Sequence, residues 1–208
     1  MRIAGQPSWR LSVSDSQSLE VALYVRDAAG IVVAGDDVPP PLTAPPPRSD
    51  VLDGADPAPV AAQWLAWWRT LVALDLELQK APTLDGAAWQ AWAREHAARR
   101  DAAGTPTDDF AGLAHAPALR QACVALAHDA YGAARRNPEL DRAPWAQTKQ
   151  VVDDVAQAHG VDPDVLSGVV IQVPTTGGWW RVVEPGAVLA STAAPYDAVV
   201  RAAFESAL

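Results

Sequence analysis

Asp75 and His96 are the residues whose types and positions most suggest acid–base or ligand-binding chemistry. Asp75 lies within the apolar stretch 64–78, read as Trp-Leu-Ala-Trp-Trp-Arg-Thr-Leu-Val-Ala-Leu-Asp-Leu-Glu-Leu. A helical period of about 3.6 residues places it on the apolar face of that stretch. The same period places His96 on the face of a second helix that carries Trp89 and Trp92. A carboxyl group and an imidazole on inward faces could serve as acid and base, or hold a small ligand in a Trp-lined pocket.

The burial expected for Asp75 needs a compensating interaction. An unpaired carboxylate in an apolar environment costs several kcal/mol, so we expect Asp75 to be paired, hydrogen-bonded or protonated. An Arg or a Trp indole N–H is the expected partner, because His96 lies roughly 15 Å along its helix at about 1.5 Å per residue. We interpret Asp75 mainly as a carboxylate that joins two elements, with catalysis or ligand binding as the alternative. A second alternative makes residues 74–79 an extended strand with Asp75 in water, although no turn residue precedes Leu74.

His128-Asp129 is similar to the His-Asp pair of the metal-dependent HD phosphohydrolases. The remaining ligands that this resemblance implies are His96 or His115 and then Asp153 or Asp154. A helix that begins near Pro117 places His128 about 180° from Leu119, on the polar face. Metal ligands converge on the interior of a bundle, and no other histidine spacing matches a zinc motif. We therefore keep metal-dependent hydrolysis as a remote alternative and assign no metal site.

The remaining nucleophile candidates fit structural roles better. Cys123 shares an apolar helix face with Leu119 and Leu126, which indicates a buried small hydrophobe. Ser167-Gly168 and the segment 175–178 lack the frames of a nucleophile elbow or a phosphate-binding loop and are typical of hairpin turns. We therefore expect no catalytic residue among them and no cofactor.

Trp179, Trp180 and Arg181 form the predicted interface. Adjacent residues of a strand project from opposite faces, so one of the two indole rings should point outward. Trp and Arg are enriched at binding hot spots, which makes the outward ring beside Arg181 a candidate anchor for a partner. A ring partly covered by a loop is the alternative.

Composition and charge limit the kinds of partner. The 208 residues are 50% hydrophobic and carry a formal net charge of −9. There are enough apolar side chains for a sizeable core, in one large domain or two small ones. Phosphate backbones and anionic lipid repel such an acidic chain, so we expect no nucleic acid and no membrane as a partner. No run reaches the ~18 apolar residues of a membrane span.

The number of cysteines indicates whether the protein works in a reducing or an oxidising cellular compartment. The single Cys123 cannot form an intramolecular disulfide, and the N-terminal residues contain no continuous apolar stretch of a secretory signal. We expect a reducing cytoplasm. The excess of Ala, and of Arg over Lys, is typical of proteins from high-GC bacterial genomes.

The elements that must position these residues fall into four regions. Residues 1–37 alternate between apolar and polar residues and predict a β-meander, with strands at 9–13, 19–25 and 31–33. Residues 38–55 contain six prolines between Val38 and Asp50 and predict an extended connector. The predicted helical region, 56–160, has helices that begin near Pro57, Asp85, Pro117 and Pro144, with ends near Gln79, Arg100, Asn137 and His159. Region 161–208 predicts a β-hairpin followed by a helix from Pro195.

We combine these regions into one α+β domain over residues 1–208. Neither terminal β region has enough strands to be stable alone, so we expect one antiparallel sheet from both. About four central helices and the C-terminal helix should pack against it. The function that fits best is non-catalytic binding of a protein partner, or self-association as a homodimer. An enzyme or small-ligand binder that uses Asp75 and His96 is the alternative.

Overall fold

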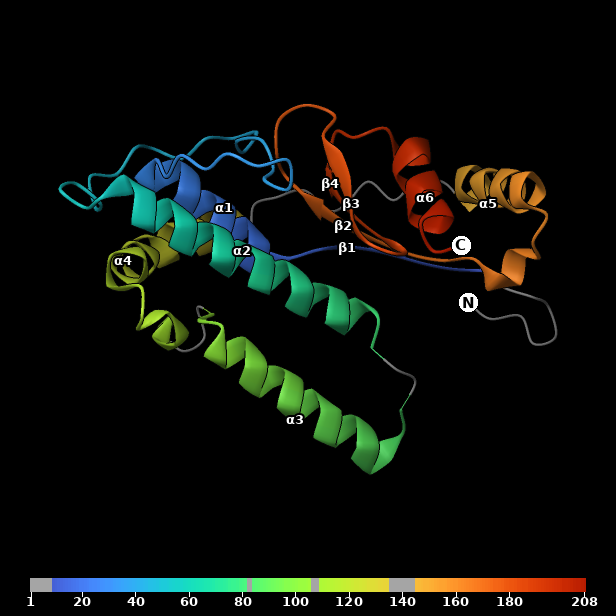
Figure 1. Cartoon of the computed structure of the whole chain (residues 1–208), viewed down its shortest axis with the longest axis horizontal. Helices are drawn as coiled ribbons and strands as arrows, with labels where there is room; N and C mark the ends of the chain where they lie inside the picture. The colour runs from blue at the N-terminus through green and yellow to red at the C-terminus, as the bar shows by residue number, and fades with distance from the viewer. Residues whose placement is uncertain (1–8, 82–83, 106–108, 135–144) are drawn as a thin grey trace. The chain divides into compact units, whose positions relative to one another are not determined.

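The computed structural model describes residues 9–81, 84–105, 109–134 and 145–208. In these ranges the chain forms six α-helices and a four-stranded sheet, which confirms the predicted α+β class (Figure 1). The helices are α1 Gln17–Ala29, α2 Pro57–Gln79, α3 Gly86–Ala102, α4 Pro117–Ala134, α5 Trp145–His159 and α6 Tyr196–Glu205. The strands are β1 Arg10–Asp15, β2 Ser167–Val173, β3 Trp180–Glu184 and β4 Ala187–Ser191. No helix in the described ranges is both long and apolar enough to cross a membrane.

The chain divides into two compact units. One consists of Met1–Asp15 and Glu139–Leu208, and it contains the sheet with α5 and α6. The other consists of Ser16–Pro138 and contains α1 to α4. A single domain over 1–208 stays a prediction.

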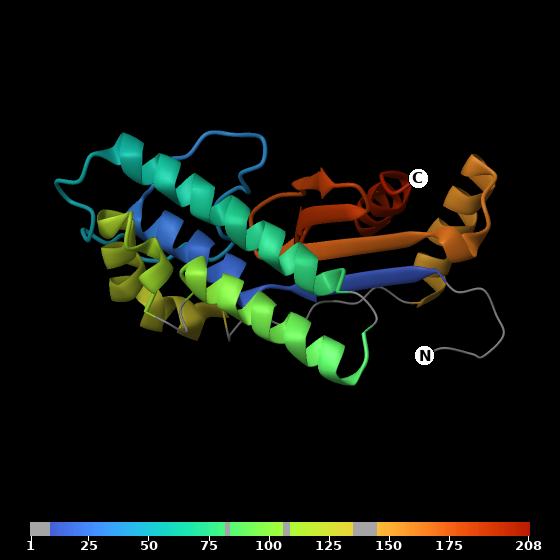
Figure 2. The same ribbon diagram turned by 60° about the horizontal axis from the view of Figure 1, so that its bottom comes forward.

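The sheet is mixed, so the predicted antiparallel arrangement was wrong for most of it. Its strand order is β1-β2-β4-β3 (Figure 2). β1 pairs parallel to β2, β2 pairs parallel to β4, and only the hairpin β3–β4 is antiparallel. Parallel neighbours need long connections, and both parallel pairs have them: α1 to α5 lie between β1 and β2, and β3 lies between β2 and β4. Alternation along a strand shows which face is buried but not the direction of the neighbouring strand.

One face of the sheet packs against α6. Val170 and Val188 on the strands form a buried cluster with Val199 and Ala203 of the helix. Gly168 allows this close approach, because a Cβ at that position would lie 3.1 Å from the Cβ of Ala203. Each fully buried Val contributes roughly 1.5–3 kcal/mol relative to exposure.

Helix α5 extends this core on the other side of α6. The core residues of this second cluster are Val151, Val152, Val155, Ala156, Leu166, Val200 and Phe204. Trp9 packs edge-on against Phe204, with ring centroids 6.4 Å apart. Residues from both ends of the chain thus share one core.

Residues 17–29 form helix α1, so the β-meander predicted for 1–37 was wrong except at β1. Leu19, Val21, Leu23 and Val25 do alternate, but Ala22 between them is also fully buried. Polar Glu20 and Arg26 of the same helix are buried too, so burial does not follow one apolar stripe, and the alternating apolar residues resemble a strand. The run 31–33, predicted as a third strand, lies outside any helix or strand, and the side chain of Val32 is exposed.

Both ends of α1 carry capping residues. The Ser16 hydroxyl accepts a hydrogen bond from the N–H of Leu19 at 3.2 Å, as an N-cap residue does. Gly30 ends the helix with φ +62°, the left-handed conformation that glycine adopts without steric cost. Ser and Gly are common capping residues, and the spacing of Ser16 and Gly30 in the sequence matches the length of this helix.

The helices of the second unit pack through tryptophans of α2. Trp64 and Trp68 stack with ring centroids 5.6 Å apart. The indole N–H of Trp64 donates to the carbonyl oxygen of Ala22 in α1 at 2.9 Å, and that of Trp67 donates to Gly104 at 3.1 Å. The buried indoles therefore satisfy their polar atoms while they join α2 to its neighbours.

The remaining regional predictions agree with the structure where it describes them. The helix predicted from Pro57 to Gln79 is α2, which excludes the alternative strand at 74–79. The predicted end at Asn137 and start at Pro144 lie outside the described residues, while Gly160 follows α5 with φ +65°. The type II turn predicted at Pro185-Gly186 joins β3 to β4, with φ +76° at Gly186.

Candidate functional site

Asp75 belongs to α2, and its side chain contacts the start of α1. Its carboxylate accepts a hydrogen bond from the hydroxyl of Ser16, and Arg100 and His96 attract it electrostatically. Burial outweighs these three effects and raises the pKa of Asp75 above its ordinary value. Its Oδ2 is buried and has no hydrogen-bond partner among the described residues.

Ser16 is the link between Asp75 and α1. Its oxygen accepts the N–H of Leu19 while its O–H donates to Asp75. The carboxylate therefore lies near the N-terminus of α1, where the helix dipole favours negative charge. The partner predicted for Asp75 from the sequence is an Arg or a Trp. Arg100 supplies the charge, and Ser16 was not considered.

His96 is the only α3 residue with a buried side chain, in a helix that is described throughout. Its Nε2 lies 2.9 Å from the carbonyl oxygen of Leu74, and because a carbonyl only accepts, Nε2 carries the proton. The imidazole stacks on Trp92 with centroids 5.1 Å apart, and Trp92 stacks on Trp89 at the same distance. The predicted aromatic face of α3 thus holds the histidine against α2.

Arg100 completes a group that we call the polar cluster, defined as Ser16, Ser18, Asp75, His96 and Arg100. Its Nη2 donates to the Ser18 hydroxyl at 3.1 Å. The five residues come from α2, α3 and the first turn of α1 with its cap. Asp75 and His96 both belong to the polar cluster, a grouping that the sequence offered only as the alternative interpretation, and each is held to a neighbouring helix by a hydrogen bond.

The chemistry open to the polar cluster is limited by access. A general acid or base must reach the reacting atom, directly or through one water. The unpaired Oδ2 of Asp75 is closed to water, and the Nε2 proton of His96 is engaged by Leu74. In this arrangement the five side chains fasten α3 to α1 and α2.

The HD-like residues do not gather into a metal site. His128 and Asp129 are both exposed on α4, on the polar face that helical periodicity indicated. Asp153 forms an ion pair with Lys149, and Asp154 with Arg201. Among the described residues no three His, Cys, Asp or Glu side chains are grouped to hold a metal ion.

Cys123 is fully buried in α4. Burial alone raises the pKa of its thiol far above the ordinary value. Since the thiolate is the reactive form, this side chain is a poor nucleophile.

Trp180 is the more exposed of the two adjacent tryptophans in the predicted interface. Its side chain is 38% exposed, whereas Trp179 is partly buried just before β3 and its carbonyl oxygen accepts the N–H of Ser191. Trp180 lies opposite Ala190 in the register of β3 and β4, on the sheet face that packs against α6. Arg181 projects from the other face and is exposed.

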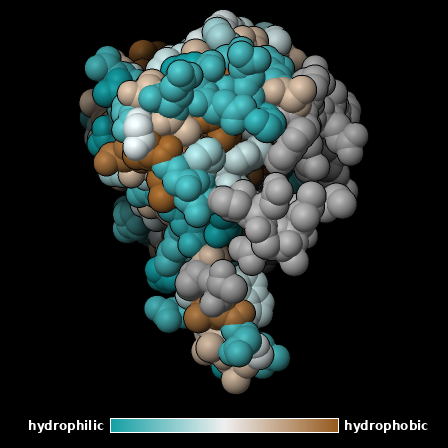
Figure 3. Space-filling view, turned by 90° about the vertical axis from the view of Figure 1, so that its right-hand side faces the viewer, coloured by the Kyte–Doolittle hydropathy of each residue, from teal (hydrophilic) through white to brown (hydrophobic). Residues whose placement is uncertain are grey.

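Strand β3 ends the sheet. It pairs with β4 on one side, and no strand of the described residues pairs with its other edge. Val182, on the same face as Trp180, is also 38% exposed. Other large exposed apolar side chains lie on several elements: Val32, Leu78, Leu84, Trp89, Val124, Val165 and Leu208. The face in Figure 3 is mostly hydrophilic, with small separate hydrophobic patches.

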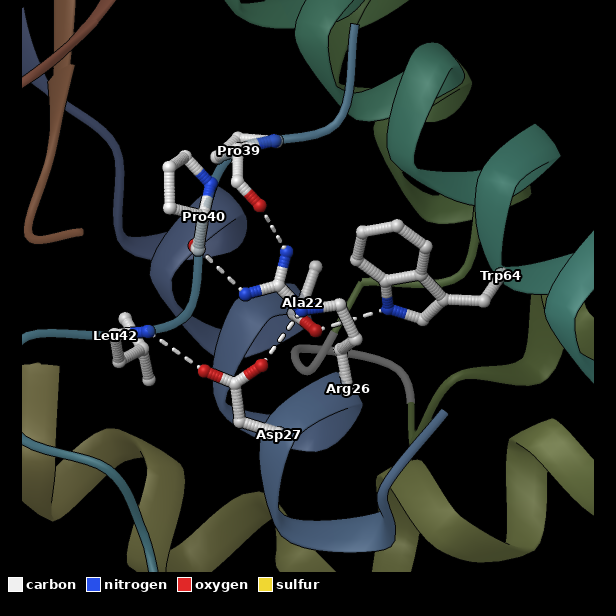
Figure 4. A network of polar contacts seen from close by, with 7 residues as sticks. All are labelled: Ala22, Arg26, Asp27, Pro39, Pro40, Leu42 and Trp64. Atoms are coloured by element: carbon white, nitrogen blue, oxygen red, sulfur yellow. Dashed lines mark hydrogen bonds and ion pairs between the residues drawn. The ribbon is translucent and has the colours of Figure 1, made fainter. Parts of the chain in front are cut away.

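Arg26 and Asp27 of α1 form a buried network that the sequence analysis missed (Figure 4). The Arg26 guanidinium donates to the carbonyl oxygens of Pro39 at 2.6 Å and Pro40 at 2.9 Å. Its Nε donates to Asp27 at 2.6 Å, and the other oxygen of Asp27 accepts the N–H of Leu42 at 2.7 Å. The predicted connector 38–55 has no helix or strand of its own, yet this network holds part of it to α1.

The Arg26 network also includes an aromatic contact. The guanidinium carbon lies 5.6 Å from the ring centroid of Trp64, within cation–π range. Arg26 is only 5% exposed, so these contacts are needed to offset the free-energy cost of burying its positive charge. Arg26 lies at the end of the alternating run that predicted a strand and Asp27 lies just beyond it, so no local pattern linked this pair to the proline-rich segment.

Comparison with protein families, curated proteins and solved structures found no match to this chain.

Proposed function

We propose that this protein acts without catalysis by binding another protein chain along the outer edge of β3. An edge strand presents a row of backbone donors and acceptors to which an extended segment can add. The single observation that carries the proposal is the position of β3 as a terminal strand with Trp180 and Val182 exposed on one face.

The side chains of β3 support a binding role. Natural edge strands are commonly protected by Lys, Pro or covering loops. The sequence of β3, Trp-Arg-Val-Val-Glu, contains neither Lys nor Pro, and its only edge protections are its short length, its charged Arg181 and Glu184 and its bulge. Burial of Trp180 and Val182 by a partner would remove apolar surface from water at roughly 25 cal/mol per Å². A strand of this composition is therefore suited to partner contact.

The alternative of an enzyme or small-ligand site at Asp75 and His96 has less support. Both residues are hydrogen-bonded to helix partners, and the one unpaired carboxyl oxygen is inaccessible to water. The exposed Trp89 is a weaker anchor than Trp180, because its ring already stacks on Trp92. HD-like hydrolysis requires convergent ligands, and the described part of the chain groups no three His, Cys, Asp or Glu side chains in this way.

The class of partner follows from charge. A net charge of −9 disfavours nucleic acid and anionic lipid, which leaves protein as the proposed partner. The single cysteine supports a cytoplasmic location as part of the same proposal.

The test compares two Val→Lys variants in the sheet-containing unit. Val182→Lys adds a charge to the β3 edge, and Val165→Lys makes the same change at a side chain that is 57% exposed in the short helical turn before β2. Each protein is immobilised and incubated with lysate of the source organism, or measured for self-association by light scattering. A partner kept by the wild type and Val165→Lys, and lost by Val182→Lys, supports the proposal. Equal retention by all three proteins, or a monomer that retains no partner, contradicts it.

A further inference from the structure

We propose that the partner of the β3 edge is β3 of a second copy, paired antiparallel about a two-fold axis with Arg181 of each copy opposite Glu184 of the other. This inference depends on the proposed function, since it names the partner of the same edge. It follows from the irregularity in β3 and from the charges on either side of it.

The irregularity brings Arg181 and Glu184 to the same face of the sheet. Arg181 pairs with Leu189 and Glu184 pairs with Ala187, and those β4 residues lie two apart. Residues two apart in a strand share a face, whereas residues three apart do not. The register shift between Val182 and Glu184 supplies the extra residue, as a β-bulge does.

A two-fold pairing centred on this bulge is complementary in charge. In an antiparallel pair about an axis normal to the sheet, opposite residues lie on the same face, and every contact occurs twice. The pairing sets Arg181 opposite Glu184 and, by symmetry, Glu184 opposite Arg181. It also sets Val182 of each copy opposite Val183 of the other, next to the exposed ring of Trp180.

The two registers centred on Arg181 and on Val182 lack this complementarity. A pairing centred on Arg181 sets two guanidinium groups opposite each other, and like charges directly opposite are destabilising. A pairing centred on Val182 sets Trp180 opposite Glu184, although the register with β4 puts these side chains on different faces. The bulge-centred register therefore matches both the faces and the charges.

The expected affinity is modest. β3 has five residues, so the interface depends on a short backbone ladder and the side chains beside it. Interfaces of this kind lie at the small end of the range for specific complexes. The net charge of −9 on each copy also opposes association, and physiological salt screens that repulsion beyond about 8 Å. We expect dissociation constants on the order of micromolar or weaker, a range typical of transient contacts.

Charge reversal tests the register. The full chain is prepared as the wild type, Arg181→Glu, Glu184→Arg and the double variant, and each is followed by sedimentation from about 1 to several hundred micromolar. Each single variant places like charges at both symmetric contacts, so we expect its dimer to weaken by about ten- to a hundredfold. The double variant restores two opposite-charge pairs and should dimerise like the wild type. An equimolar mixture of the two single variants should also dimerise, because an all-acidic edge then meets an all-basic one.

The outcomes separate this inference from the proposed function. Single variants that dimerise like the wild type, or a mixture no more associated than its components, overturn the register. A different outcome is a wild type that stays monomeric while it retains a lysate protein that Val182→Lys does not retain. That result contradicts a second copy as the partner but agrees with the proposed function. Arg181 and Glu184 each have a further interaction within the chain, so circular dichroism melts of every variant must first match the wild type.

Discussion

The imidazole of His96 donates its Nε2 proton to the carbonyl oxygen of Leu74 at 2.9 Å and thereby joins α3 to α2. No other α3 side chain is buried. Since most of the stability of a helix in a protein comes from tertiary packing, α3 depends on such contacts for its order. The stacking of His96 on Trp92 adds to the same contact.

Replacement of His96 by Ala should loosen α3 selectively. The change removes a buried hydrogen bond and leaves a small void, for a loss of about 1–3 kcal/mol in the free energy of unfolding. Amide hydrogen exchange should accelerate most in α3. His128→Ala, at an exposed position on α4, is the matched control and should leave the α3 amides unchanged. Unchanged α3 exchange in His96→Ala would refute the role assigned to this histidine.

Asp75→Asn should change how stability depends on pH. Burial raises the pKa of Asp75 in the folded chain, so the folded state holds this proton more tightly than the unfolded state. The contribution of Asp75 is fully present below its ordinary pKa of 3.8 and is lost as the pH rises through the raised folded value. We expect the stability of Asp75→Asn relative to the wild type to rise over that window in urea unfolding. A variant that becomes relatively less stable over the same window would show that the ionised form is the favoured one.

Arg26→Lys tests the network around the proline-rich segment. A Lys cannot reproduce the guanidinium geometry that reaches Asp27, Pro39 and Pro40 together. At least one buried acceptor loses its partner, at a cost of about 1–3 kcal/mol in the free energy of unfolding. Arg94→Lys on the exposed face of α3 is the matched control. Equal urea midpoints for the two variants would show that the network contributes little.

Cys123 should be inert towards thiol reagents in the folded protein. It is fully buried, and burial raises its pKa, so little thiolate is present at neutral pH. A disulfide exchange reagent should react at the rate of global or local opening, and at once after unfolding in guanidinium. Because the chain has one cysteine, the signal comes from this site alone. Rapid reaction under native conditions would contradict the burial.

Local sequence patterns are sufficient to predict some of the helices and misleading for others. Helix α2 was predicted with its bounds, because Asp56 and Pro57 mark its start and no breaker interrupts the following apolar run. Helix α1 was read as a strand, since Leu19, Val21, Leu23 and Val25 alternate in a segment that is buried on all sides. There the capping residues at its two ends were a better guide than the alternation.

Contacts between residues far apart in sequence were the part of the site that was hardest to predict. The inward faces of Asp75 and His96 followed from helical periodicity alone. The hydrogen bond from Ser16 and the contacts of Arg26 join residues far apart in sequence, and no local pattern indicates such pairs. The bulge that puts Arg181 and Glu184 on one face depends on the pairing with β4, which composition does not reveal.

The sedimentation of the wild type beside Val182→Lys tests the central claim most directly. We predict a concentration-dependent rise towards the mass of two chains for the wild type, and a single-chain mass for Val182→Lys at every concentration. A wild type that stays at one chain throughout, or a Val182→Lys variant that associates equally well, would contradict the assignment of the β3 edge as the self-association surface.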